Sequence, residues 1–220
     1  MKIAGFKKQS LIDYPGHLSS VVFTQGCNFR CDFCHNPELV LPEKFGKLYD
    51  EKIIWDYLAK YSTMLDAVCI TGGEPTIHKD LPEFCLKIKN YGLKVKLDTN
   101  GTNPSMLEQM IKKHIVDYIA MDIKHILEPN AYNRATGNRT PPDIFDKILY
   151  SIELIRDSGI KHVFRTTVVK GLHTQKDIKL LKKIFGKNYV IQNYNPEVVL
   201  NPYSGYISFS EEEFDLLKNL

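Results

Sequence analysis

The sequence predicts an α/β protein whose fold is an incomplete (β/α)6, TIM-like barrel with a parallel sheet. Short apolar runs alternate with helical patterns along most of the chain, and together they form six pairs. Strands that alternate with helices are typical of βα units joined in a parallel sheet. Six units are fewer than the eight of a closed TIM barrel. The sequence therefore favours an incomplete barrel or an open sheet, and we take the incomplete barrel as the prediction.

Each predicted strand is a short apolar run, and most of these runs are rich in Val, Ile and aromatic residues. Such a composition is expected of strands that are covered on both faces. The predicted strands are residues 20–24, 67–71, 93–97, 118–123, 162–169 and 189–192. Residues 1–19 form an N-terminal segment that precedes the first barrel strand.

The predicted helices carry apolar residues at helical spacing, and some have recognisable ends. They are residues 50–62, 79–91, 104–113, 142–157, 174–185 and 210–220. Asn103 is an expected N-cap, with Pro104 in the first turn of the helix that follows. Ser210 and Glu213 match a capping box at the start of the last helix.

The composition predicts one domain that spans residues 1–220. Apolar residues make up 43% of the chain, which is enough to build one core. No Pro-, Gly- or Ser-rich linker divides the sequence. No apolar run approaches the ~20 residues of a membrane span, and residues 1–8 lack a signal-peptide pattern. We therefore expect a cytoplasmic protein that does not interact with membranes.

The charge balance argues against nucleic acid as a partner. Lys and Arg number 29 and Asp and Glu number 26, which gives a formal net charge of +3. Nucleic-acid-binding proteins usually concentrate their basic residues in one patch. The densest lysine cluster, within residues 176–187, alternates with apolar residues at helical spacing and so indicates a solvated helix face.

Polar or glycine-rich segments follow five of the predicted strands. They are residues 25–34, 72–75, 98–101, 122–124 and 170–171. In parallel α/β folds, ligands bind at the C-terminal ends of the strands. Because all five segments are expected at the same edge of the sheet, the sequence predicts an enzyme with its active site there.

The cysteines point to a metal centre within the first of these segments. The chain has five cysteines and no recognisable secretory signal, so reduced thiols are expected. Cys27, Cys31 and Cys34 have the spacing C-x3-C-x2-C. Cys69, inside a predicted strand, and Cys85, on an apolar helix face, are expected to be ordinary core residues.

Three kinds of site are compatible with this spacing. A structural zinc site would take His35 as its fourth ligand, although zinc ligands are usually separated by two or more residues. A redox pair would need only Cys31 and Cys34 and would leave Cys27 unexplained. A [4Fe–4S] cluster would use all three cysteines and leave one iron free to bind a substrate.

The motifs resemble those of a known superfamily. The cysteine spacing, with the aromatic Phe33 before the last cysteine, resembles the signature of radical S-adenosylmethionine (SAM) enzymes. Residues 72–75 (Gly-Gly-Glu-Pro) resemble the second motif of that superfamily. Residues 98–101 (Asp-Thr-Asn-Gly) and 122–124 (Asp-Ile-Lys) resemble motifs of glycyl-radical-enzyme activating enzymes.

A narrower similarity lies near the N-terminus. Residues 10–16 (Ser-Leu-Ile-Asp-Tyr-Pro-Gly), followed by residues 23–28, are similar to the activating proteins of anaerobic ribonucleoside-triphosphate reductase. The resemblance as a whole runs along nearly the entire chain. It implies an oxidoreductase with two cofactors, a [4Fe–4S] cluster and SAM.

The resemblance also implies roles for the cysteines and the second motif. Cys27, Cys31 and Cys34 would bind the cluster, whose fourth iron would bind the amino and carboxylate groups of SAM. Gly72 and Gly73 would let the backbone approach the methionine part of SAM. Glu74 would accept a hydrogen bond from the ammonium group of SAM. Pro75, the last residue of the motif, would contact the same ligand. An ordinary strand-to-helix turn would have the same composition.

Further residues are implied around the SAM carboxylate. Asp98, Thr99 and Asp122 would lie near a monovalent cation beside that carboxylate, with Asn100 next to them. Asp98 and Asn100 would otherwise cap turns. Lys124 would offset the charge of the carboxylate and act in catalysis.

The remaining implied residues would surround the cluster and the nucleoside. Arg165 would face the same cavity as a further catalytic group, and the segment that begins at Val168 would make a fifth-strand contact to SAM. Phe33 would lie beside the adenine, and His35 and Asn36 would lie beside the cluster. The last three could equally be packing or turn residues.

The sequence departs from the family in its last strand. Activating enzymes of the pyruvate formate-lyase type show a histidine late in the sixth strand, whereas residues 191–196 contain none. Asn195 would be a substitute donor. The chain also lacks the extra cysteine clusters of activating enzymes with a ferredoxin-like insert, which indicates the compact type.

The resemblance implies protein partners. The target would be a backbone glycine of a glycyl-radical enzyme, the large subunit of anaerobic ribonucleotide reductase, and a flavodoxin or ferredoxin would donate the electron. Two other functions stay open at this stage. One is a radical SAM enzyme that acts on another glycyl-radical enzyme or on a small molecule, and the other is a non-catalytic zinc-binding module.

Overall fold

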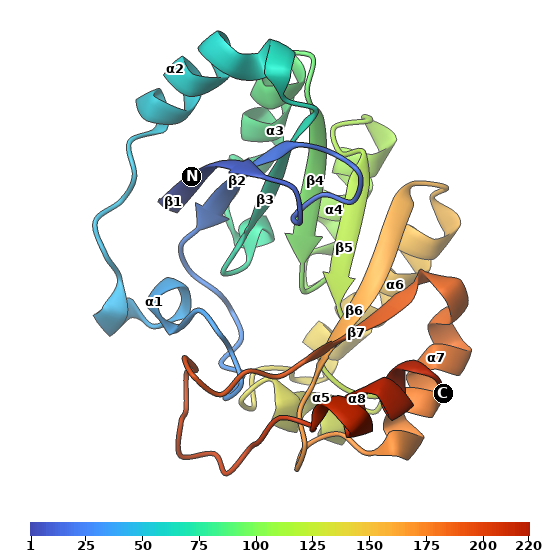
Figure 1. Ribbon diagram of the computed structural model, residues 1–220. Coiled ribbons are helices and arrows are strands. Elements are labelled where there is room, and N and C mark those ends of the chain that lie inside the picture. The colour runs from blue at the N-terminus through green and yellow to red at the C-terminus, as the bar shows by residue number, and fades with distance from the viewer.

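Seven strands form one sheet whose spatial order follows the order of the chain, in a computed structural model that describes all 220 residues (Figure 1). β1 pairs antiparallel with β2, and β2 to β7 are parallel to one another. The strands are β1 (Ile3–Ser10), β2 (Ser19–Thr24), β3 (Ala67–Gly72), β4 (Lys94–Thr99), β5 (Tyr118–Asp122), β6 (Lys161–Val168) and β7 (Tyr189–Asn193). Because β1 and β7 do not pair with each other, the barrel is incomplete, as predicted.

β1 is the one strand that the sequence did not predict. Its middle carries Lys7, Lys8 and Gln9, which are exposed, and its register against β2 shifts twice. Lys7 and Lys8 lie on a free edge of the sheet, where lysines discourage pairing with another chain. Because of this polar run, β1 lacks the alternation of apolar and polar residues that marks a strand. Residues 1–19 were therefore expected to precede the sheet, whereas part of this segment extends it.

The helices cover the outer face of the curved sheet and agree with the predicted ones within a few residues (Figure 1). They are α2 (Glu51–Tyr61), α3 (Leu81–Lys89), α4 (Pro104–Lys112), α6 (Pro142–Asp157), α7 (Gln175–Phe185) and α8 (Glu211–Lys218). The side chain of Asn103 caps α4, and Ser210 and Glu213 form the capping box of α8. Both predicted helix starts are confirmed.

Short helices join these elements and were not predicted, because they are too short for a helical period to show. They are α1 (Pro37–Val40), α5 (Pro129–Ala135) and four 3₁₀ turns at Pro42–Lys44, Ser62–Met64, Pro75–Ile77 and Gly186–Asn188. α1 and α5 flank the loop that follows β2. They therefore help to position the cysteine segment.

One connected apolar core lies between the sheet and its helices. It includes residues of every parallel strand, among them Val22, Ile70, Leu97, Ile119 and Phe164, each at most 1% exposed. No helix of the chain is long and apolar enough to cross a membrane.

Candidate active site

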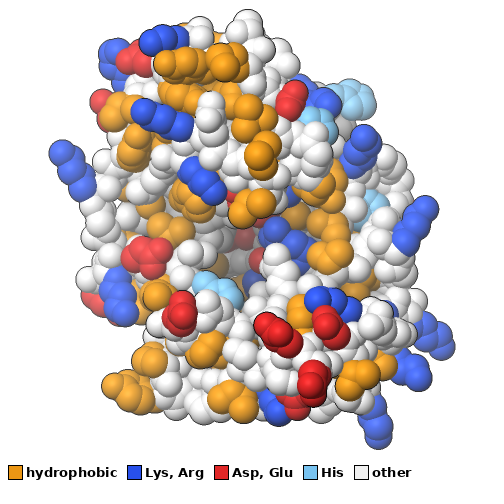
Figure 2. Space-filling model, viewed as in Figure 1, with side chains coloured by type: hydrophobic (Ala, Val, Ile, Leu, Met, Phe, Trp, Pro, Cys, Tyr) orange, Lys and Arg blue, Asp and Glu red, His pale blue; other side chains and the backbone are white.

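A cavity of about 260 Å³ opens at the C-terminal ends of the parallel strands. Figure 2 shows a hollow near the centre of this face, with acidic and basic side chains inside it. The cavity is lined by residues from the segments that follow β2, β3, β4 and β5, and from β6 and β7. The predicted site residues that line it are Cys27, Cys31, Phe33, Cys34, His35, Asn36, Gly72, Gly73, Glu74, Asp98, Thr99, Asn100, Asp122, Lys124 and Arg165.

Two residues that were predicted to contact SAM, Pro75 and Val168, do not line the cavity. Pro75 is buried and begins a 3₁₀ turn below the cavity wall. The side chain of Val168 is 0% exposed and belongs to the apolar core. The carbonyl oxygen of Val168 accepts a hydrogen bond from the backbone N–H of Tyr194 at 3.1 Å. The segment after β7 therefore occupies the place beside Val168 where a contact to SAM was expected.

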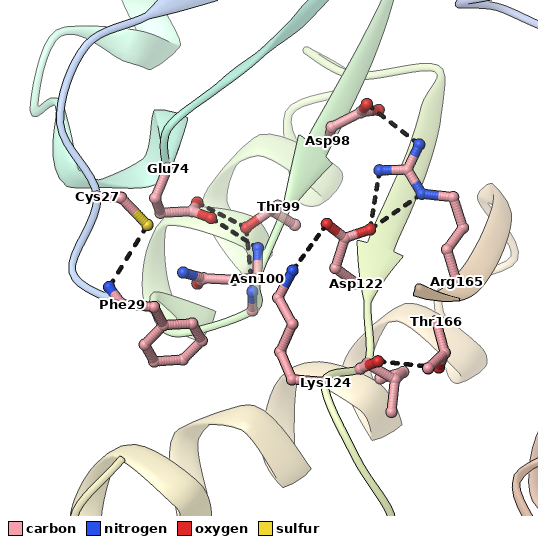
Figure 3. Close-up of polar contacts among 12 residues, drawn as sticks. Cys27, Phe29, Glu74, Asp98, Thr99, Asn100, Asp122, Lys124, Arg165 and Thr166 are labelled. Atoms are coloured by element: carbon pink, nitrogen blue, oxygen red, sulfur yellow. Dashed lines mark hydrogen bonds and ion pairs between the residues drawn. The ribbon is translucent and has the colours of Figure 1, made fainter. Parts of the chain in front are cut away.

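The cysteine loop is fixed by its own backbone and by α5. The backbone N–H of Phe29 donates to Sγ of Cys27 at 3.4 Å (Figure 3). The guanidinium group of Arg30 donates to the carbonyl oxygens of Cys27 and Phe29 at 2.7 and 2.8 Å. The backbone N–H of Arg30 donates to the carbonyl of Thr136, just after α5, at 3.0 Å. A segment without regular secondary structure is thus held in one conformation.

The chemistry of this loop fits a cationic iron–sulfur centre. Burial raises the pKa of the Cys27 and Cys31 thiols to about 12, so both are neutral in the protein alone. A metal centre replaces those protons with positive charge and binds the thiolates. No three His, Cys, Asp or Glu side chains, the three cysteines of the loop included, are placed to hold a single metal ion.

The second motif packs tightly against the cysteine loop. A Cβ atom at Gly72 would fall 2.5 Å from the backbone nitrogen of Thr24, and φ of Gly72 is +116°. The backbone N–H of Glu74 donates to the carbonyl of Gly26 at 2.8 Å. Gly72 and Gly73 are therefore required first by contact between two protein segments, whereas from the sequence they were expected to contact a ligand.

Glu74 joins the second motif to the segment after β4. Its side chain is 1% exposed and accepts hydrogen bonds from Thr76 and Thr99 on Oε1, and from the backbone N–H of Asn100 on Oε2 at 2.6 Å (Figure 3). Burial raises the pKa of this carboxyl, and the hydrogen bonds oppose that rise. Because protein donors already occupy both oxygens, Glu74 first of all fixes the shape of the cavity wall.

A row of alternating charges runs across the floor of the site. Arg165 bridges two carboxylates, with Nη1 3.2 Å from Oδ2 of Asp98 and Nη2 2.9 Å from Oδ1 of Asp122. Nζ of Lys124 lies 3.1 Å from Oδ2 of Asp122, as Figure 3 shows. Behind Asp98, its Oδ1 pairs with the ammonium group of Lys96.

These pairs determine the charge state of the site. Burial alone would raise the pKa of Asp122, but Arg165 and Lys124 lower it to about 2. Burial alone would lower the pKa values of Lys124 and Arg165, but Asp122 raises both. All three groups are therefore charged at neutral pH, and the site presents fixed charges to a polar ligand.

Several site residues were missed by the sequence argument. Thr167 and Gln192 line the cavity from β6 and β7, where they are paired neighbours. The two-residue spacing from Arg165 could have revealed Thr167, because alternate strand residues share a face. Gln192 stands where the family's histidine was sought, whereas Asn195 is exposed and does not line the cavity.

Of the residues around the cysteine loop, Asn28 was missed, whereas His35 was predicted. Asn28 donates to Thr102 and accepts from Asn100, both at 2.8 Å, and so ties the loop to the segment after β4. His35 stacks on Tyr194 at 5.6 Å between ring centroids and accepts from the backbone N–H of Asn195. His35 therefore holds the segment after β7 against the cavity.

Comparison with known proteins places these motifs in a family. The model of the radical SAM superfamily matches residues 21–184. A protein of Methanocaldococcus jannaschii assigned as a glycyl-radical enzyme activating enzyme is 35% identical over 199 residues, 89% of this chain and 80% of its own length. A pyruvate formate-lyase-activating enzyme of Clostridium pasteurianum is 31% identical over 211 residues, 92% of this chain and 82% of its own length.

Solved structures share the fold. A radical SAM methyltransferase from Sphaerobacter thermophilus superposes with a TM-score of 0.69 at 14% identity, over 94% of this chain and 63% of that chain. Enzymes of the superfamily use a [4Fe–4S] cluster and SAM. The chain belongs to the radical SAM superfamily and, within it, to the glycyl-radical enzyme activating enzymes.

Proposed function

We propose that this protein cleaves SAM reductively and generates a glycyl radical on anaerobic ribonucleoside-triphosphate reductase. The observation that carries the proposal is the convergence of three cysteine thiols and a row of alternating charges on one cavity. The cavity lies at the C-terminal ends of the parallel strands, in a barrel whose edge strands β1 and β7 do not pair (Figure 1). The open side of this incomplete barrel is the proposed entry for a polypeptide loop of the target.

Cys27, Cys31 and Cys34 are the proposed ligands of the cluster, because all three line the cavity from one loop. When bound, the cluster would supply the electron for reductive cleavage of SAM, and this radical chemistry would remove a hydrogen atom from the target glycine. A flavodoxin or ferredoxin is the proposed source of that electron. The protein's part is to hold the reacting groups and keep water away from them.

The row of alternating charges formed by Asp98, Arg165, Asp122 and Lys124 is the proposed binding site for the methionine part of SAM. Lys124 and Arg165 line the cavity and carry positive charge toward it, which suits the SAM carboxylate. Glu74 supplies negative charge on the opposite wall, near the expected position of the ammonium group. Phe33, which is 5% exposed and also lines the cavity, offers an aromatic surface for the adenine.

Two features support the reductase as the target. Residues 10–16 and 23–28 are similar to the activating proteins of that enzyme. The cysteines outside the loop, Cys69 and Cys85, are both buried at 0% exposure, so neither is available for a second exposed cluster. The chain is thus compatible with a compact activating enzyme that carries one cluster.

Electron paramagnetic resonance tests the target directly. The anaerobic holoenzyme is incubated with SAM, a reductant and either the candidate reductase or pyruvate formate-lyase. We expect a glycyl-radical doublet with the reductase, and no doublet when its radical-bearing glycine is replaced by alanine. Replacing dithionite with reduced flavodoxin or ferredoxin identifies the physiological class of donor.

Other outcomes would contradict the proposal at different levels. A doublet on pyruvate formate-lyase alone would replace the proposed target with another glycyl-radical enzyme. SAM cleavage without a doublet on either protein would favour a radical SAM enzyme that acts on a different substrate. Failure to cleave SAM at all, in a holoenzyme with its full iron content, would overturn the proposed activity.

A further inference from the structure

Lys96 is a buried cation that lies behind the site, and it was not identified from the sequence. It lies on β4, two residues before Asp98, so both side chains point to the interior of the barrel. Its side chain is 5% exposed, and its ammonium group has two partners. They are Oδ1 of Asp98 and, at 3.5 Å, Sγ of Cys69 on the neighbouring strand.

A buried ammonium group requires a compensating carboxylate, because an unpaired charge is costly in a low-dielectric interior. Asp98 is the carboxylate that compensates Lys96. Its other oxygen faces Nη1 of Arg165 at 3.2 Å. Both oxygens of Asp98 are therefore engaged by cations of the protein itself.

The other groups expected around a monovalent cation are engaged in the same way. Asp122 uses Oδ1 for Arg165 and Oδ2 for Lys124. The hydroxyl of Thr99 donates to Oε1 of Glu74 at 2.8 Å. Each aspartate that would ligate a cation at this place already faces two cations of the protein, so its negative charge is compensated and the pair does not fit a bound Na⁺ or K⁺.

The charge count leads to the same result. Lys96, Arg165 and Lys124 face Asp98 and Asp122, so the row carries three positive charges and two negative ones. One further carboxylate, such as that of SAM, would make the row neutral. An added metal cation would instead find no uncompensated carboxylate in the row, and Glu74, the other carboxylate of the cavity, is held by Thr76, Thr99 and the backbone N–H of Asn100.

We infer that Lys96 takes the place of the monovalent cation that the family resemblance implies, and that this enzyme binds SAM without K⁺ or Na⁺. Lys96 does not line the cavity, so it acts as a positioning residue. It holds the carboxylate of Asp98, which in turn holds the guanidinium group of Arg165 toward the ligand. The inference rests on the proposed function only in that the site binds SAM.

Calorimetric titration of the reconstituted holoenzyme with SAM, without reductant or target protein, tests the inference. The titration is done in KCl, in NaCl and in tetramethylammonium chloride at equal ionic strength. We expect the dissociation constants of the native protein for SAM to agree within about twofold. Binding that is tenfold or more weaker in tetramethylammonium chloride would overturn the inference.

The variant Lys96→Met removes the charge and keeps a long side chain. We expect it to bind SAM at least tenfold more weakly in tetramethylammonium chloride and to regain affinity in KCl, because the freed carboxylate then accepts K⁺. A merely structural role would lower the thermal midpoint without creating dependence on the salt. SAM affinity equal to that of the native protein in both salts would contradict the inference.

Lys89→Met is the matched control. Lys89 also pairs with an aspartate, Asp117, at 2.7 Å, but it lies on α3 and does not line the cavity. Its loss should leave the SAM affinity unchanged in every salt. If Lys96→Met does not fold, the titrations of the native protein still decide the question. Absence of SAM binding in all salts would overturn the proposed function as well, whereas dependence on the cation overturns the inference alone.

Discussion

Gly73 lies so close to Gly26 that a Cβ atom at Gly73 would fall 1.9 Å from the carbonyl oxygen of Gly26. No side chain can be placed at that distance from a backbone atom without moving one of the two segments. The same carbonyl accepts the backbone N–H of Glu74 at 2.8 Å. The end of β3 is therefore locked onto the first turn of the cysteine loop.

This contact predicts that Gly73→Ala destabilises the protein. The added methyl group must push the two loops apart, and overpacking of this kind typically costs about 1–3 kcal/mol. Denaturant unfolding of the apoprotein measures the change. The control is Gly46→Ala, since Gly46 is exposed and a Cβ there meets nothing within 4 Å. Equal stability of Gly73→Ala and Gly46→Ala would refute the close approach of the two loops.

The cysteine loop predicts a selective loss of iron. Cys31→Ala should prevent stable cluster formation and abolish SAM cleavage while the fold is kept, because Cys31 lies on a loop outside the sheet. Cys85→Ala, on α3 and away from the cavity, should retain about four irons per chain. Iron and sulfide analysis after anaerobic reconstitution distinguishes the two variants. Full iron content in Cys31→Ala would exclude Cys31 as a ligand.

His173 predicts a dependence of stability on pH. Its Nδ1 accepts from the backbone N–H of Val169 at 3.1 Å, and its Nε2 donates to the carbonyl of Lys124 at 3.0 Å. Burial, together with the neighbouring His125, lowers the pKa of His173 to about 4 from 6.5. The imidazole of His173 is therefore protonated below pH ~6.5 in the unfolded chain, but only near pH 4 in the folded chain.

Stability should therefore fall as the pH decreases from about 6.5 to 4, by up to about 3 kcal/mol from this group. His173→Leu should show a shallower pH dependence of the unfolding free energy over that interval, although it is less stable overall. His114→Asn, at an exposed position with positive φ, should keep the dependence of the native protein. An unchanged slope in His173→Leu would show that His173 is not the group responsible.

Arg165 predicts a loss of SAM affinity when its charge is removed. Arg165→Gln cannot bridge Asp98 and Asp122, so the row loses a positive charge and the two carboxylates repel the carboxylate of the ligand. We expect about a 10- to 100-fold increase in the KM for SAM, because a charge-assisted contact contributes roughly 1.5–3 kcal/mol. Arg156→Gln, on the exposed side of α6, is the control. A KM within twofold of the native value would argue against the role of Arg165.

Much of the site could be predicted because its motifs follow strands. The segments 72–75, 98–101 and 122–124 each come at the end of an apolar run, so parallel pairing had to bring them to one edge. β1 could not be predicted in this way, because its polar second half shows no clear alternation. Nor could α5, a helix of seven residues that holds the cysteine loop through Thr136.

Local sequence was enough to determine the order of strands and helices, the cysteine spacing and the edge of the sheet where polar residues gather. These features depend on near neighbours in the chain and on the two-residue and 3.6-residue periods of strands and helices. Folding in three dimensions determined how charges pair. Asp98 meets Lys96 and Arg165, and Gly73 meets Gly26, only because separate strands curve around one interior. Such pairs join residues that are distant in the chain, and hydrophobic periodicity contains no information about them.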